Sequence, residues 1–109
     1  MHIHLVAPKP LFPFAAAGTE LSAKIDNEGF VSDIVFVVPN FTNAITATLT
    51  IHDEDGNELY NSTAKAENAV YVITGIRVPV TFGFSAKVTL SGVAGGAGGT
   101  VSARLFIGA

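Results

Sequence analysis

The chain has 109 residues, the length of one domain. Hydrophobic residues make up 49% of it and charged residues 14%, so it has enough apolar area to fold and is not of the disordered class. The net charge of -3 argues against a nucleic-acid-binding protein, and no apolar run is long enough for a membrane-spanning helix. With no cysteine, the chain has neither a disulfide framework nor a thiolate metal site.

The first 14 residues predict an irregular arm. Pro8, Pro10 and Pro13 stiffen this segment and give it little tendency to join a sheet. They also interrupt any signal-like apolar core, and no basic region precedes it, which favours a mature cytosolic protein. Phe12 and Phe14 are candidate anchors for apolar pockets of a neighbour. The alternative is that the arm folds back and caps its own sandwich.

The remaining chain predicts β-strands. Val, Ile, Thr, Phe and Tyr supply 40 of the 109 residues, and residues 44–52 alternate between apolar and polar side chains, as a half-buried strand does. Residues 21–25, 87–91 and 101–107 predict further strands. Residues 30–38 and 69–76 are more continuously apolar, as is typical of strands covered on both sides. Strong helix signals are absent.

The residues 53–58 predict a hairpin turn, because Asp55-Gly56 lies between two alternating runs. A two-residue turn would place Ile51 opposite Tyr60. A three-residue loop with a bulge at Gly56 would instead pair Ile51 with Leu59 and His52 with Glu58. We favour the bulged version, because it keeps aliphatic residues together and places a histidine opposite a carboxylate.

Residues 92–99 contain five glycines and predict a flexible loop that joins two strands as a long hairpin. Short strands at this spacing predict an all-β fold, namely a single antiparallel β-sandwich or jelly-roll-like domain of about 6–8 strands over residues 1–109. Residues 1–20 would form the N-terminal arm and first strand, and residues 21–109 the sandwich core.

Few residues are arranged for chemistry. Oxygen donors at Asp53, Asp55 and Asn57 resemble the start of a calcium loop, but the twelfth position is Ala64, so a solvated hairpin tip is the better interpretation. His2 and His4 share one face of an extended segment and would need a third ligand to hold a metal. No nucleophile motif occurs. We expect a protein that is not an enzyme, with no cofactor and no metal.

The charges are unevenly distributed. Residues 1–67 contain all nine acids and a balance of -6, whereas residues 68–109 contain Arg77, Lys87 and Arg104, no acid, and a balance of +3. A neutral β-rich surface invites pairing with other chains, and a few basic residues on it suit docking onto an acidic lattice. Arg77, Lys87 and Arg104 therefore join Phe12 and Phe14 as candidate interface residues. The alternative is a small domain that merely tolerates a weakly charged surface.

The strand at residues 45–52 with its Asp55-Gly56 hairpin, and the C-terminal pair 86–93 and 100–107 around the glycine loop, resemble small β-sandwich virion proteins of tailed bacteriophages. The resemblance implies a capsid decoration (cement) protein that is located on the capsid surface, commonly as a homo-oligomer and above all a trimer. Its partner would be the major capsid protein or another virion protein, with neither nucleic acid nor membrane bound. Two alternatives are a neck or tail component and a carbohydrate- or ligand-binding module, although the chain has no Trp to serve as a platform for the latter.

Overall fold

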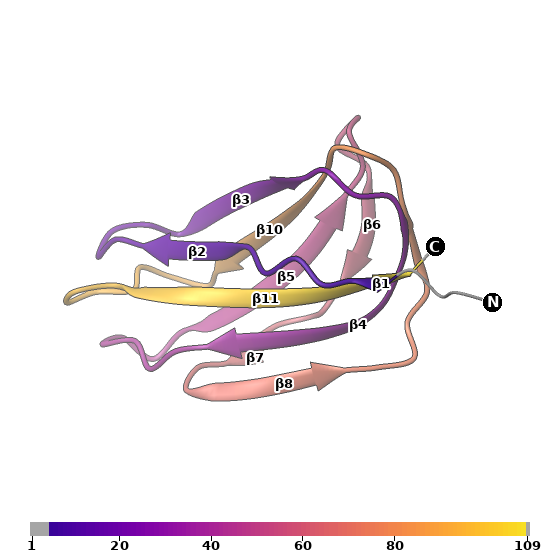
Figure 1. Cartoon of the computed structure of the whole chain (residues 1–109). Helices are drawn as coiled ribbons and strands as arrows, with labels where there is room; N and C mark the ends of the chain where they lie inside the picture. The colour runs from indigo at the N-terminus through magenta and orange to yellow at the C-terminus, as the bar shows by residue number, and fades with distance from the viewer. Residues whose placement is uncertain (1–4, 109) are drawn as a thin grey trace.

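The computed structural model describes residues 5–108, which form two antiparallel sheets packed face to face (Figure 1). The six-stranded sheet contains β1 (Leu5–Val6), β2 (Leu11–Phe14), β4 (Gly29–Val38), β8 (Ala69–Ile73), β9 (Val78–Val80) and β11 (Gly99–Gly108). The five-stranded sheet contains β3 (Glu20–Ile25), β5 (Thr46–His52), β6 (Glu58–Asn61), β7 (Lys65–Ala66) and β10 (Phe84–Leu90). The predicted all-β sandwich is confirmed. The eleven strands exceed the 6–8 expected, because several edge strands are only two to four residues long.

Long central strands organise both sheets. In the six-stranded sheet, β11 and β4 pair with each other; β1 and β2 line the outer side of β11, and β8 and β9 line the outer side of β4. In the five-stranded sheet, β10 lies between β3 and β5, and β6 and β7 both pair with β5. The outermost strands are therefore β1, β2, β8 and β9 in one sheet, and β3, β6 and β7 in the other.

The core lies between the two sheets and is built by strict alternation. In β5, Ala47, Leu49 and Ile51 are fully buried, as the pattern of residues 44–52 predicts. The largest fully buried side chains are Phe12, Phe36 and Phe84, which come from β2, β4 and β10. Both sheets thus bury one apolar face against the other, and burial of these faces is the main stabilising contribution. Within residues 5–108 there is no helix, and hence none that could cross a membrane.

The prediction of an irregular N-terminal arm is wrong, because the N-terminal segment joins the six-stranded sheet. Leu11–Phe14 pairs with β11, with Pro13 opposite Thr100. Further along, the carbonyl oxygens of Pro8 and Pro10 accept hydrogen bonds from the N–H groups of Leu105 and Ala103. Proline lacks a donor but keeps its acceptor, so it fits an outermost strand. The prolines therefore do not prevent the segment from pairing at the edge of the sheet.

The hairpin at residues 53–58 combines features of both predicted versions. The N–H of Gly56 donates to the carbonyl of Asp53, and Gly56 has a positive φ of 86°, as the three-residue loop requires. His52 lies opposite Glu58, which confirms that pair. The Ile51–Leu59 pair is wrong, because the register shifts and Ile51 lies opposite Tyr60. This bulge turns Leu59 to solvent and packs Tyr60 against the core, where burial raises the pKa of its hydroxyl.

The glycine-rich loop is neither a hairpin nor a loose connection. It crosses from β10 in the five-stranded sheet to β11 in the six-stranded one. It is held by hydrogen bonds from the Asn43 N–H to the Ala94 carbonyl and from the Gly95 N–H to the Ala16 carbonyl. Gly98 has a φ of 72°, and a Cβ there would overlap the carbonyl oxygen of Phe14. The glycines permit close approach of backbones, and the prediction of a long hairpin is wrong because the loop joins strands of different sheets.

Candidate interaction surface

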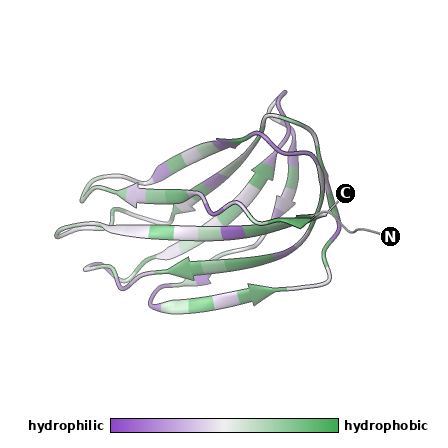
Figure 2. Cartoon of the chain, viewed as in Figure 1, coloured by the Kyte–Doolittle hydropathy of each residue, from purple (hydrophilic) through white to green (hydrophobic). Residues whose placement is uncertain are grey.

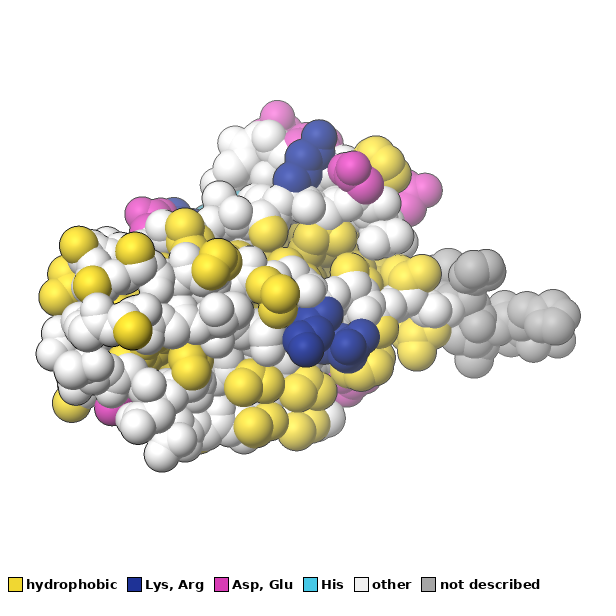
Figure 3. Space-filling model, turned by 60° about the vertical axis from the view of Figure 1, so that its left-hand side comes forward, with side chains coloured by type: hydrophobic (Ala, Val, Ile, Leu, Met, Phe, Trp, Pro, Cys, Tyr) yellow, Lys and Arg dark blue, Asp and Glu magenta, His cyan; other side chains and the backbone are white. Residues whose placement is uncertain are grey.

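The outer side of the six-stranded sheet carries an apolar surface. Its apolar outward side chains, which we call the apolar face, are Leu11, Val35, Val37, Val70, Val72 and Phe106. The polar residues Ser102, Arg104 and Asp33 lie on the same side of the sheet. Figure 2 shows hydrophobic residues along most of β4 and β8, and Figure 3 shows that hydrophobic and uncharged side chains dominate the visible surface. A contiguous apolar surface of this kind on a folded chain usually marks a place of contact with another molecule.

The register places the members of the apolar face in rows across the sheet. Leu11 lies beside Ser102, which lies beside Val37, which lies beside Val70. In the next row, Arg104 lies beside Val35, which lies beside Val72. Side chains directly opposite each other on one sheet face are in contact range. The apolar face therefore extends from β2 across to β8 as a continuous strip.

β8 is exposed, contrary to the prediction that residues 69–76 are covered on both sides. The strand ends at Ile73 and is an outermost strand of its sheet. Val70 is 62% exposed and Val72 is 67% exposed, whereas Tyr71 and Ile73 pack toward the core. Val35 and Val37 on β4 are likewise only partly covered, because residues 5–108 form no third layer over this sheet. The continuously apolar sequence of residues 69–73 therefore belongs to a strand with one uncovered face, and not to a strand buried on both faces.

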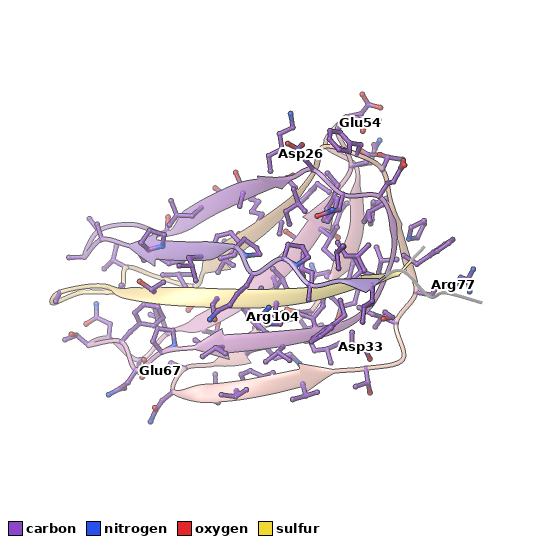
Figure 4. All side chains as sticks on the ribbon, viewed as in Figure 1. Asp26, Asp33, Glu54, Glu67, Arg77 and Arg104 are labelled. Atoms are coloured by element: carbon purple, nitrogen blue, oxygen red, sulfur yellow. The ribbon has the colours of Figure 1, made fainter. Side chains whose placement is uncertain are left out.

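Arg104 is a basic residue on the same side of the sheet as the apolar face, where it lies beside Val35 on one side and the exposed Lys9 on the other. Its side chain lies on β11 (Figure 4) and donates a hydrogen bond of 3.0 Å to the carbonyl of Ala7. Asp33 lies on the neighbouring strand, opposite Phe106. Among residues 5–108, the ion pairs are Lys24–Asp26 and Lys87–Glu20, so the guanidinium of Arg104 has no carboxylate partner. It is therefore available to a carboxylate of a partner.

The other predicted basic residues lie elsewhere. The guanidinium of Arg77 stacks 4.2 Å from the ring centroid of Phe30, at the end of the sandwich where β1 begins and β11 ends (Figure 4). Lys87 lies on β10 in the five-stranded sheet and forms an ion pair with Glu20. The three basic residues of the C-terminal part are therefore not brought together into one patch.

Phe12 and Phe14 are buried in the domain's own core, with exposures of 1% and 4%. The ring of Phe14 packs edge-on against that of Phe41, with centroids 6.5 Å apart. The expectation that these rings are exposed anchors is corrected, and the alternative in which the segment folds back over its own sandwich describes the structure. The reason is alternation along β2, which points both rings inward and Leu11 outward.

The outer side of the five-stranded sheet is polar. Its outward side chains include Thr46, Thr48, Thr50 and His52 on β5, and Ser85, Lys87 and Thr89 on β10. Several of these groups satisfy one another: the Nε2 of His52 lies 2.9 Å from the Oγ1 of Thr50. Hydrogen-bonded polar groups of this kind are compatible with water and provide little apolar contact area.

The acidic hairpin tip uses its carboxylate to close the turn. Asp53 Oδ1 accepts hydrogen bonds from the N–H groups of Asp55 and Asn57, and its Oδ2 accepts one from the Asn57 side-chain amide. The Asn57 amide, and after it the Asn57 N–H, holds the pKa of Asp53 below its usual value. No group of three metal-ligating side chains occurs among the described residues, and His2 and His4 lie outside them.

The sequence-based reasoning missed Leu11, Val70 and Val72 as surface residues. The signal was present in residues 69–73, a short apolar strand with neither a charge nor a proline. We interpreted it as a buried strand, because hydrophobicity alone does not distinguish an interior strand from an uncovered one.

Comparison with known proteins does not assign the chain to a family. No protein-family model matches the chain, and no curated protein matches it. Among solved structures, the infectious bursal disease virus Gx strain matches with 17% identity and a TM-score of 0.39, over 98% of this chain and 31% of that one. The VP2 subviral particle of the same virus matches with 16% identity and a TM-score of 0.38, over 97% and 33% of the two chains. The chain thus spans about a third of the length of these proteins, at a similarity too low to assign a shared function.

Proposed function

We propose that this chain is a non-enzymatic virion structural protein that binds and stabilises the capsid shell of a bacteriophage, as a decoration or cement protein. The observation that carries the proposal is the apolar face, which crosses the six-stranded sheet beside Arg104, a residue that forms no ion pair within residues 5–108. Its partner would be the major capsid protein or another virion protein, and it would be located on the capsid surface.

The balance of polar and apolar groups supports a protein contact. The exposures of Leu11 (58%), Val70 and Val72 provide the contact area, and burial of such area contributes about 25 cal/mol per Å². Arg104 adds a directional contact to an acidic group, which provides specificity more than affinity. A neutral surface over most of residues 68–109 favours close packing against a shell rather than long-range attraction.

The proposal is tested by the number of copies per purified particle, measured by quantitative mass spectrometry against the major shell protein. Hundreds of copies, near parity with the shell subunit, are expected for a decoration protein. About six to twelve copies would reassign the chain to a neck or tail. Absence from particles would overturn both virion roles and leave the ligand-binding module, in which the outer face of the five-stranded sheet would be the first surface to examine.

A further inference from the structure

We propose that β8 is a pairing edge for a second copy of this chain, and that two copies join through antiparallel β8–β8 contact into one continuous sheet. The inference concerns the backbone edge of β8, whose outward Val70 and Val72 also belong to the apolar face, and it does not depend on what that face binds. It rests on the state of the outermost strands, on the symmetry of a pair of identical edges, and on the register that the outward valines allow.

The other outermost strands are protected against pairing. β2 and β9 contain Pro13 and Pro79, which cannot donate to a ladder, and β1 is only two residues long. In the five-stranded sheet, β3 carries Glu20 and Lys24, β6 has a bulge and begins at Glu58, and β7 is two residues long. Charges, prolines, bulges and short length are the features that keep strand edges apart.

β8 has none of these features. Its five residues, Ala69–Ile73, include no charge and no proline, and its register with β4 is continuous. The backbone groups on its outer side are donors and acceptors that only another extended strand can match in full. Because the other edges of residues 5–108 are protected, a ring built from two different edges is disfavoured, and the matching strand is β8 of another copy.

The symmetry of the pair selects an antiparallel arrangement. A two-fold axis perpendicular to the sheet joins the same edge of both copies, runs the two strands antiparallel, and keeps the outward side chains of both copies on one face. Parallel pairing of two identical edges would turn the outward valines of the two copies to opposite faces of the sheet.

The register follows from the side-chain alternation. For the outward valines of both copies to share one surface, the two-fold axis must pass through a residue of β8, because side chains alternate with a period of two. Only an axis at Tyr71 pairs all five residues. Val70 of each copy then lies opposite Val72 of the other, and the two apolar faces become one.

The area buried in this contact is small. Five residues span about 17 Å, and an edge contact of that length buries less than the roughly 1,200 Å² at which stable interfaces begin. The pair is therefore expected to be a weak, reversible dimer in solution, which a surface binding many copies side by side would strengthen.

The test is the mass of the full chain in solution, measured by sedimentation over a range of concentrations. We expect a monomer–dimer equilibrium. Val70→Lys, which places a charge at the edge, should weaken dimerisation at least tenfold. Val37→Lys is the matched control, because Val37 lies opposite Val70 on the same face but in an interior strand. It should leave the dimer intact.

A second measurement uses the cysteine-free background. A mixture of Val70→Cys and Val72→Cys chains should form disulfide-linked dimers on oxidation, and either chain alone should form far fewer, because equivalent residues are then too far apart. A monomer at all concentrations, equal effects of the two lysine variants, or a trimer that Val70→Lys leaves unchanged would overturn the pairing. None of these results would change the number of copies per particle, so failure of the proposed function would be seen separately.

Discussion

The two outer faces of this sandwich differ in a way that the shared core does not explain. Both sheets bury apolar inner residues, but the outward positions of the six-stranded sheet are mainly apolar. Those of the five-stranded sheet are mainly threonine, serine and charged residues. Val70 and Val72 are more than half exposed, whereas Thr50 on the opposite side is hydrogen-bonded to His52. The comparison indicates that one face is suited to water and the other to a partner.

The largest expected effect on stability tests whether β2 packs into the sandwich of its own chain. Phe12→Ala should lower the free energy of unfolding by about 3–5 kcal/mol, because it leaves a cavity in the core. Leu11→Ala, one residue earlier but exposed, is the control and should change it little. Chemical denaturation measures both. If Phe12→Ala left stability unchanged, the segment would not pack against its own sandwich and the apolar face would lose its β2 border.

The next effect concerns the loop that holds β2 in place. Gly98→Ala should be destabilising by more than the ~1–2 kcal/mol that a positive φ costs an alanine, since its Cβ would also overlap the backbone of Phe14. Gly56→Ala, where φ is also positive but nothing lies within 4 Å, isolates the cost of φ alone. Thermal unfolding of both variants gives the difference. Equal losses would show that the loop does not press on β2.

A smaller effect distinguishes the two faces by their charges. Arg104→Ala should weaken binding to purified shells several-fold, because it removes the unpaired cation of the apolar face. Lys87→Ala should leave binding unchanged and alter stability by less than about 1 kcal/mol, since it breaks only an exposed ion pair with Glu20. Co-sedimentation with shells compares them. If Lys87→Ala weakened shell binding and Arg104→Ala did not, the contact would lie on the five-stranded sheet.

The smallest effect lies at the hairpin tip. The pKa of Asp53 is lowered in the folded chain, so its contribution to stability is present above the unfolded pKa and is lost as the pH falls through the folded one. The melting temperatures of the native chain and Asp53→Ala should therefore converge on acidification. A difference in melting temperature that persists at low pH would contradict the assignment of the turn to Asp53.

Sequence patterning predicted the sandwich because the inward residues obey a local rule. Residues 44–52 alternate, and the structure buries Ala47, Leu49 and Ile51 as that alternation requires. The hairpin tip was predictable for the same reason, because Gly56 is a local requirement of the turn. Elements determined by neighbours in sequence could therefore be inferred from sequence alone.

The candidate surface could not be inferred, because it depends on which strands lie outermost. Strand order placed β8 at an edge and β2 beside β11, and those positions are set by packing between distant residues. The prolines of the N-terminal segment indicate an irregular arm, although an outermost strand tolerates them. The outward position of Arg104 opposite an apolar set on β11 follows from local alternation, and its role in an interface stays a prediction.

The measurement that most directly tests the apolar face is a matched pair of lysine variants in a shell-binding assay. Val37→Lys and Thr48→Lys each place one charge outward on an interior strand, one on each sheet. With folding verified by circular dichroism, co-sedimentation with purified shells should be weakened at least tenfold by Val37→Lys and unchanged by Thr48→Lys. Undiminished binding of Val37→Lys together with lost binding of Thr48→Lys would contradict the account and assign the contact to the polar face.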